Sequence, residues 1–138
     1  QMVDNQLEQF CIDDYSLRIL SGLNIDKIKT IRKRNYSYLL ENLIHIRSFE
    51  LLFKILPTEV TPLYCPVRVK KRYEIQRRLS MSSIYAPIVW PKSVLLPNVS
   101  PIINTLYEEL LCLPIDQRYD NEDMERLVQC IVEIMCEV

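Results

Sequence analysis

Glycine is almost missing from this sequence. The 138 residues include a single glycine, Gly22, where ordinary usage of about 7% would give about ten. Loops that hold phosphate groups need glycine, because their backbone adopts positive φ angles and approaches the ligand closely. The sequence therefore excludes a Walker-type or dinucleotide-binding loop, and we do not expect it to hold a phosphorylated cofactor by that route.

Residues that bind metals are scarce as well. His45 is the sole histidine, and no C-x-x-C pair occurs among the five cysteines, which are Cys11, Cys65, Cys112, Cys130 and Cys136. A zinc site would require four of these scattered thiols to converge, so we interpret them as small buried hydrophobic residues and expect no metal site. A nucleophilic triad would have to use His45, which lies in the helix expected over residues 41–49, and no other feature supports one.

Long apolar runs are also missing. The longest, residues 84–91, is far shorter than the ~20 residues that cross a membrane, and no signal peptide opens the chain. With 17 basic and 18 acidic side chains, the sequence lacks the basic excess of a dedicated nucleic-acid binder. We therefore expect a cytoplasmic protein that binds neither membranes nor nucleic acid. The basic residues 27–34 and 68–78 are interpreted as solvated helix faces, and a phosphate or nucleic-acid site on residues 27–34 is the weaker alternative.

The positions of the prolines divide the sequence clearly. All eight lie between Pro57 and Pro114, so both flanks are free of helix breakers. Apolar residues at helical spacing predict one long helix from Asn24 or Asp26 to about residue 44, and another that begins after Asp120 or Asn121. Between these helices the pattern predicts further elements: strands over residues 60–69, 83–91 and 111–115, and helices over residues 70–81 and 102–110.

This order of elements predicts an α+β fold. We expect a two-layer sandwich in which helices pack on a small, mostly antiparallel sheet, with long helices at both ends of the chain. The 138 residues are interpreted as one domain, in which residues 1–22 form an apolar N-terminal segment and residues 23–138 form the main fold.

Two short runs are candidates for function. The first, Tyr85-Ala86-Pro87-Ile88-Val89-Trp90-Pro91-Lys92, places the one tryptophan between prolines at the end of an expected strand. Prolines restrict the backbone, which suits a rigid lip; Trp90 either stacks on a flat or sugar-like ligand there or covers the core. The second, Leu113-Pro114-Ile115-Asp116-Gln117-Arg118-Tyr119-Asp120, is a polar turn before a capped helix. Its simpler interpretation is structural, with Asp116 and Arg118 paired locally.

In this order and at this distance, the two runs resemble the C-terminal small domain of the DegT/DnrJ/StrS family. The second run, followed by Glu122-Asp123-Met124, is similar to an LP-x-x-x-R-Y turn with an E-D-M helix start. Two more stretches support the resemblance: Ile31-Arg32-Lys33-Arg34-Asn35-Tyr36, similar to a basic R-x-N-Y segment, and Arg72-x-x-Ile75-x-x-x-Leu79-x-x-x-Ser83-Ile84, similar to R-x-x-L-x-x-x-L-x-x-x-G-I. The family consists of fold-type I, PLP-dependent aminotransferases that act mainly on nucleotide-linked keto sugars. The resemblance covers about residues 15–137.

Two departures from the family pattern limit what the resemblance implies. Ser83 stands where the family has glycine, which suggests that the backbone need not be left-handed at this residue. The family's large domain carries the Schiff-base lysine and holds the PLP phosphate; these residues contain no counterpart of it, and no lysine here can be assigned that role. The resemblance therefore implies PLP for an intact family member and no cofactor in this chain.

The resemblance also implies a function. The chain is expected to be a C-terminal fragment or remnant of a sugar aminotransferase of bacterial polysaccharide biosynthesis, inactive alone, with glutamate as the usual amino donor. Tyr85, Trp90 and Lys92 would line the substrate entrance, and Arg118 would bind substrate or anchor the turn. The alternative is a non-enzymatic interaction module that docks on another chain. Expected partners are a missing or separate PLP-binding large domain and, because the first 20 residues are rich in apolar side chains, a second copy of the chain.

Overall fold

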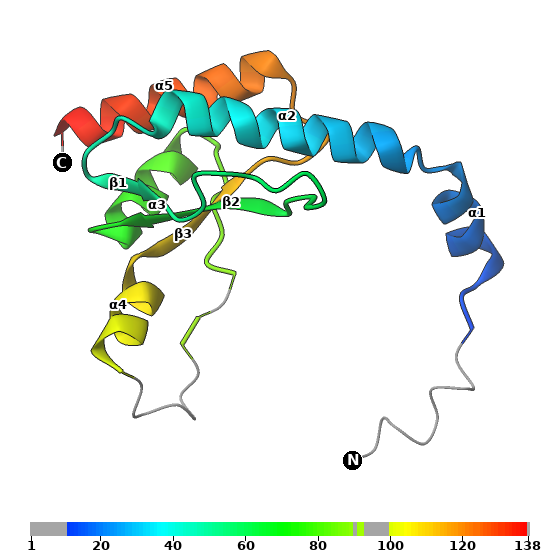
Figure 1. Cartoon of the computed structure of the whole chain (residues 1–138), viewed down its shortest axis with the longest axis horizontal. Helices are drawn as coiled ribbons and strands as arrows, with labels where there is room; N and C mark the ends of the chain where they lie inside the picture. Colours follow the sequence, from blue (N-terminus) through cyan, green and yellow to red (C-terminus); the bar gives the residue numbers. More distant parts are fainter. Residues whose placement is uncertain (1–10, 90, 93–99, 138) are drawn as a thin grey trace.

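The computed structural model describes residues 11–89, 91–92 and 100–137 of the chain (Figure 1). In this part of the chain the helices are α1 (Asp14–Gly22), α2 (Ile25–Leu43), α3 (Arg72–Met81), α4 (Pro101–Glu109) and α5 (Asn121–Glu137). The strands are β1 (Phe49–Leu51), which lies between α2 and α3, β2 (Tyr64–Val69), which precedes α3, and β3 (Leu110–Pro114), which precedes α5. The α+β fold predicted from the sequence is confirmed.

The three strands form one antiparallel sheet in the order β1-β2-β3. Burial alternates along β2, so that Cys65, Val67 and Val69 are buried while the residues between them are half-buried. The register places Val67 beside Leu51 of β1 and Leu111 of β3, both of which are buried. The sheet therefore has one apolar face and one half-open face.

Helices α2, α3 and α5 cover the apolar face, and α2 and α5 lie side by side above the sheet in Figure 1. Each contributes an apolar stripe to the core, which includes the buried residues Leu39 and Leu43 of α2, Ile75 and Leu79 of α3, and Leu127 and Ile131 of α5. Spacing of three or four residues places each pair on one side of its helix. Burial of these stripes against the sheet is the main stabilising contribution of the helix layer.

Side-chain caps fix the beginnings of the two long helices. Asn24 Oδ1 accepts a hydrogen bond of 2.9 Å from the backbone N–H of Lys27, at the start of α2. At the start of α5, the carboxylate of Asp120 accepts from the Asp123 N–H while the carboxylate of Asp123 accepts from the Asp120 N–H, each at 3.1 Å. Both caps satisfy N–H groups that lack a partner inside the helix. The predicted helix starts are confirmed.

Two helices lie outside this packed layer. Figure 1 shows α1 bending away from α2 at one end of the molecule, while α4 lies below the sheet at the other end. Within the described chain, neither helix buries a residue. On the half-open face of the sheet, Arg68 pairs with Glu50 at 2.6 Å and with Glu109 at 3.4 Å.

None of the helices in the described ranges is both long enough and apolar enough to cross a membrane.

The strand predicted over residues 83–91 is wrong for the residues described there, which are irregular from Ile84 to Val89. This segment lies along β3 and accepts a hydrogen bond of 3.3 Å from the Cys112 N–H at the Pro87 carbonyl. A ladder needs N–H groups in return, and proline has none. The helix predicted over residues 41–49 is also wrong, since α2 ends at Leu43 and is followed by a turn and by β1, which the sequence did not predict.

The prediction for Ser83 is wrong as well: its backbone is left-handed, with φ of 59°. Ser83 follows Ser82, the C-cap of α3. Its N–H donates to the Ser80 carbonyl at 3.0 Å, and the Ile84 N–H donates to the Leu79 carbonyl at 2.8 Å. These two bonds form a Schellman motif, whose characteristic apolar contact is supplied by the buried residues Leu79 and Ile84. The local conformation is the one for which glycine is favoured, and serine adopts it here.

Candidate functional site

The residues that follow α3 form the first part of the candidate site. After the Schellman turn, the chain buries Ile84 and Ala86 and exposes the side chain of Tyr85 between them. The carbonyl of Ala86 accepts a hydrogen bond of 2.7 Å from Gln76 Nε2 of α3, and the next carbonyl, that of Pro87, accepts from Cys112 of β3. The backbone on the C-terminal side of Tyr85 is therefore held from two sides, while its ring is 75% exposed and free to contact a ligand.

Lys92 lies near α4 and belongs to a short polar chain. Its ammonium group donates to Asn104 Oδ1 at 2.7 Å, and Asn104 Nδ2 donates to Glu108 Oε1 at 2.6 Å. The carboxamide of Asn104 thus joins the cation of Lys92 to the anion of Glu108 on one side of α4. Lys92 is exposed, so its remaining N–H groups can contact solvent or an anionic ligand. Trp90, the other candidate in this run, lies outside the described residues.

Arg118 lies in the turn between β3 and α5 and pairs with Asp116, as the structural interpretation of this turn predicted. Its Nε donates to Asp116 Oδ1 at 2.8 Å, and its backbone N–H donates to the same oxygen at 3.0 Å. Partial burial alone would raise the pKa of the Asp116 carboxyl, but the hydrogen bonds and charge of Arg118 and the charge of Arg32 lower that pKa below its usual range. The guanidinium of Arg118 remains 77% exposed.

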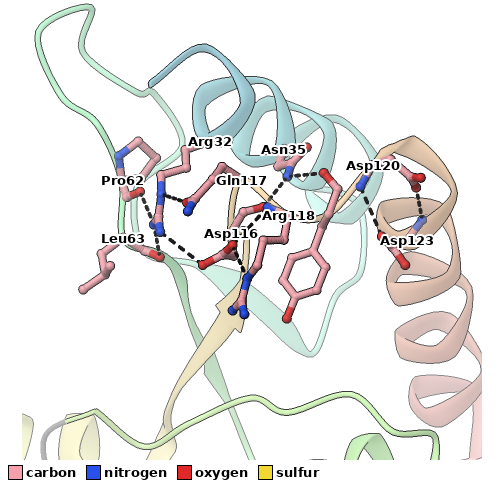
Figure 2. A network of polar contacts seen from close by, with 10 residues as sticks. Arg32, Asn35, Pro62, Leu63, Asp116, Gln117, Arg118, Asp120 and Asp123 are labelled. Carbon is pink, nitrogen blue, oxygen red and sulfur yellow. Dashed lines mark hydrogen bonds and ion pairs between the residues drawn. The ribbon is translucent and has the colours of Figure 1, made fainter. Parts of the chain in front are cut away.

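The bonds that anchor this turn to the rest of the fold come from α2 (Figure 2). Arg32 donates to Asp116 Oδ2 at 3.3 Å, to Gln117 Oε1 at 2.9 Å and to the carbonyls of Pro62 and Leu63. The fully buried Asn35 donates through Nδ2 to the carbonyls of Asp116 and Tyr119, at 3.1 and 3.2 Å. The anchor of the turn is therefore Arg32 and Asn35, where the sequence analysis expected Arg118.

A sequence signal for this anchor exists and was missed. Counting back from the buried Leu39, residues 35, 32 and 28 continue the apolar stripe of α2 at helical spacing, but positions 32 and 35 are occupied by Arg32 and Asn35. Polar residues on a stripe that faces the core need partners there, because an unpaired buried polar group is costly. The pattern thus indicates a buried polar contact, although it does not identify the partner about 80 residues away.

The described residues form one small cleft beside Tyr85. It has a volume of about 60 Å³ and is also lined by Tyr119, Asp123 and Arg126. Binding sites for organic molecules usually measure ~300–1,000 Å³, so this cleft alone does not enclose a nucleotide-linked sugar. Lys92 and Arg118 contact other groups, on α4 and in the turn, and do not line this cleft. The four candidates are thus not gathered in a single enclosed pocket by the described residues.

The residues present do not fit a PLP site. All seven lysines lie in the described ranges, and six of them are exposed: Lys27, Lys29, Lys54, Lys70, Lys71 and Lys92. The seventh, Lys33, donates to the carbonyl of Thr58. A Schiff-base lysine has to meet an enclosed cofactor; Lys54 lines two shallow, open hollows beside His45, and none of the lysines lines the cleft beside Tyr85. Elsewhere in the described part of the chain, no group of three or more His, Cys, Asp or Glu side chains is arranged to hold a metal ion.

The buried thiols do not form a reactive site. Burial raises the pKa of Cys65 to about 12, with a further contribution from Cys112, and burial also raises the pKa of Cys112. Both thiols therefore stay protonated at neutral pH, and a protonated thiol is a poor nucleophile. Burial likewise raises the pKa of Tyr36 to about 12, and its hydroxyl donates to the Phe53 carbonyl at 2.9 Å. The interpretation of the cysteines as buried hydrophobic residues is confirmed for Cys65 and Cys112, but it is wrong for Cys11 and Cys136, which are exposed, and Cys130 is half-buried.

Comparison with known proteins gives matches at the level of structure. No protein-family model and no curated protein sequence matches the chain. A sugar aminotransferase from Micromonospora echinospora matches with a TM-score of 0.73 and 17% identity, over 85% of this chain and 33% of that chain. A DegT DnrJ EryC1 StrS aminotransferase from Brucella abortus matches with a TM-score of 0.69 and 17% identity, over 86% and 34%. NtdA from Bacillus subtilis, with bound cofactor PMP, matches with a TM-score of 0.61 and 16% identity, over 79% and 28%.

The chain thus spans about a third of the length of the solved structures that it matches. At identities below 20% the likeness concerns the fold, and it extends over most of this chain. The resemblance that the sequence motifs indicated is confirmed at this level: the chain has the fold of about one third of a DegT/DnrJ/EryC1/StrS sugar aminotransferase.

Proposed function

We propose that this chain is the substrate-side part of a PLP-dependent sugar aminotransferase, and that the cofactor is held by another part of the protein or by a separate chain. One observation carries the proposal: the match covers about 85% of this chain but a third of the aminotransferase chain. Alone, the chain would not transfer an amino group. The sequence motifs support a nucleotide-linked keto sugar as the acceptor, glutamate as the usual donor, and a cytoplasmic role in polysaccharide biosynthesis.

The distribution of exposed apolar side chains supports a missing neighbour. Large hydrophobic residues that are at least about half exposed occur on α1 and just before it, on the loop between β1 and β2, on α3 and just after it, and on α4: Ile12, Tyr15, Leu17, Ile19, Leu20, Phe53, Ile55, Leu63, Tyr73, Met81, Tyr85 and Ile102. Exposed apolar surface on a small protein usually marks an interface, and here it occurs at both ends of the molecule, on α1 and on α4. A PLP-bearing domain that packs against these elements would bury this surface and complete the site.

The candidate substrate contacts follow from chemistry and position. Lys92 and Arg118 are exposed cations, which suit the diphosphate of a nucleotide-linked sugar, and Tyr85, in the same sequence run as Lys92, presents an exposed ring. We propose that these three residues, with Trp90, face the substrate once the PLP-bearing domain is in place. None of them is proposed to act on a proton or a bond of the substrate.

An activity assay tests the proposal. The product of the complete reading frame around this chain is incubated with glutamate and a set of nucleotide-linked keto sugars, and amino sugar formation is followed by mass spectrometry. We expect transfer by the complete product and none by this chain alone. Lys92→Ala should raise KM for the sugar nucleotide by about tenfold, as expected for a lost charge-assisted bond to phosphate. Lys70→Ala, which removes another exposed lysine, should leave KM unchanged.

The alternative is a non-enzymatic interaction module, which the same exposed apolar surface would serve. The two functions differ in whether the complete product binds PLP. A complete product that carries no PLP and transfers no amino group, but forms a stoichiometric complex with another chain through α1 or α4, would decide for the module.

A further inference from the structure

Two side chains of α3, Gln76 and Arg72, form hydrogen bonds with residues outside their own helix, and the sequence motifs assign no role to these bonds. Gln76 of α3 donates through Nε2 to the Ala86 carbonyl at 2.7 Å. Ala86 is fully buried and directly follows the exposed Tyr85. The hydrogen bond therefore fixes the peptide next to a candidate substrate contact, and it joins segments ten residues apart across the Schellman turn.

Arg72, four residues before Gln76, contacts the C-terminal end of α4, the helix that carries the partner of Lys92. It is 5% exposed, and its guanidinium donates to the Tyr107 carbonyl and, at 3.3 Å, to the Leu110 carbonyl, at the C-terminal end of α4. The same group lies 4.5 Å from the ring centre of Tyr73. A cation is favoured at this end of α4, because the helix dipole and the free carbonyls place negative charge there.

The environment of Arg72 is unusual for a buried charge. Among the residues that the structure describes, Arg72 has no carboxylate partner, and its Nε has no hydrogen-bond acceptor. Burying a cation under these conditions is costly, so the gain must come from the carbonyls that it holds. One of those carbonyls, that of Tyr107, belongs to α4, the helix that also carries Asn104, the partner of Lys92; the other, that of Leu110, opens β3 directly after α4.

Both anchors are on the same helix. Positions 72 and 76 are one turn apart and lie on one side of α3. Gln76 holds the segment that carries Tyr85 directly, and Arg72 holds α4, which in turn holds Lys92 through Asn104. The remaining contact of the first segment, from the Cys112 N–H to the Pro87 carbonyl, lies one residue beyond the Gln76 bond.

We propose that Arg72 and Gln76 are positioning residues, and that α3 sets the relative placement of Tyr85 and Lys92 by holding the backbone on both sides of the entrance. That this placement serves a sugar nucleotide rests on the function proposed above. The positioning itself does not, because it consists of contacts inside this chain.

Amide hydrogen exchange of the chain, followed by NMR, tests the positioning. Gln76→Glu keeps the size of the side chain but replaces the N–H donor with an oxygen that repels the Ala86 carbonyl. Loss of one hydrogen bond should open this segment locally and speed the exchange of the Cys112 amide about tenfold, while β2 amides stay within about twofold. Gln76→Ala should give the same pattern. Gln129→Glu, the same change at an exposed position of α5, should leave Cys112 unaffected.

Unchanged Cys112 exchange in both Gln76 variants, or equal acceleration throughout β2, would overturn the positioning role. In the complete product, Gln76→Glu should raise KM for the sugar nucleotide and leave kcat unchanged, as expected for a displaced contact. A complete product that transfers no amino group refutes the proposed function alone, since the exchange result stands without it.

Discussion

Ser83 adopts a left-handed backbone with a side chain that disfavours it. A residue with a Cβ atom is strained in this region, whereas glycine is not. Replacing Ser83 with glycine should therefore stabilise the chain by about 1 kcal/mol, measured as the free energy of unfolding in urea. Ser82→Gly is the matched control: its φ of −89° suits any residue, so added backbone freedom should cost about 0.5 kcal/mol. A loss of stability in Ser83→Gly would contradict the Schellman assignment.

Asn35 is a buried polar residue that fastens the turn before α5. Asn35→Ala removes the amide nitrogen that donates to the carbonyls of Asp116 and Tyr119. It also removes the amide oxygen that accepts hydrogen bonds from Arg34. The loss should be about 2–3 kcal/mol in the free energy of unfolding. Asn42→Ala, on the same helix, removes a hydrogen bond to the Tyr38 carbonyl at an exposed position and should cost less than about 0.5 kcal/mol. Similar effects of the two changes would show that the buried contact adds nothing.

Two buried groups make stability depend on pH in the alkaline range. The pKa of Cys65 and that of Tyr36 are both raised to about 12 in the folded chain, from ordinary values of 9.0 and 10.0. The neutral forms are therefore favoured by folding, and their contribution is complete below pH 9 and lost as the pH rises towards 12. Unfolding by urea at a series of pH values should show this decline. Cys65→Ala should make the decline shallower, and stability that rises over this range would contradict the burial of both groups.

At the scale of elements, α1 is joined to the fold through α2 and contributes little to it. The helix buries no residue within the described chain, and its exposed side includes Tyr15, Ile19 and Leu20. Leu17→Pro, which breaks α1 at an exposed position, should change the free energy of unfolding by less than about 0.5 kcal/mol, as for other changes away from the core. A loss above about 2 kcal/mol would show that α1 packs in solution.

The same helix is expected to promote self-association of the isolated chain. Sedimentation from micromolar to millimolar concentration should show a dimer or larger species, because exposed apolar patches associate. Leu20→Ser should shift the species towards monomer, while Arg18→Ser on the same helix should not. A clean monomer for the unaltered chain over this range would contradict the prediction.

The elements differ in how far the sequence determines them. The long helices were predicted because a repeated apolar stripe and a capping side chain are local signals, and Asn24 and Asp120 supply the caps. Residues 84–89 have the composition of a strand, but pairing depends on N–H groups and on a neighbour about 25 residues away, neither of which a local pattern reveals. For the turn before α5, the stripe of α2 indicates that Arg32 and Asn35 need polar partners, but it does not identify them, since Arg32 contacts Gln117 from 85 residues away.

At the scale of the whole molecule, the chain packs a continuous apolar core but leaves many large apolar side chains exposed on its surface. The sheet and its helix layer bury a continuous set of apolar residues, while α1, α4 and the loop after β1 present large apolar side chains to solvent. The fold matches a third of a sugar aminotransferase, and within the described residues the small cleft beside Tyr85 is lined by no lysine. Our central claim is that the chain supplies the substrate side of such a site and holds no PLP of its own.

Titration of the isolated chain with PLP, followed by its absorption spectrum and by borohydride reduction with mass spectrometry, tests this claim most directly. We predict no stoichiometric band of protein-bound PLP, and after reduction a low level of label spread over the exposed lysines, because these amines react without an enclosing site. A band of one PLP per chain that disappears on substitution of a single lysine would contradict the account.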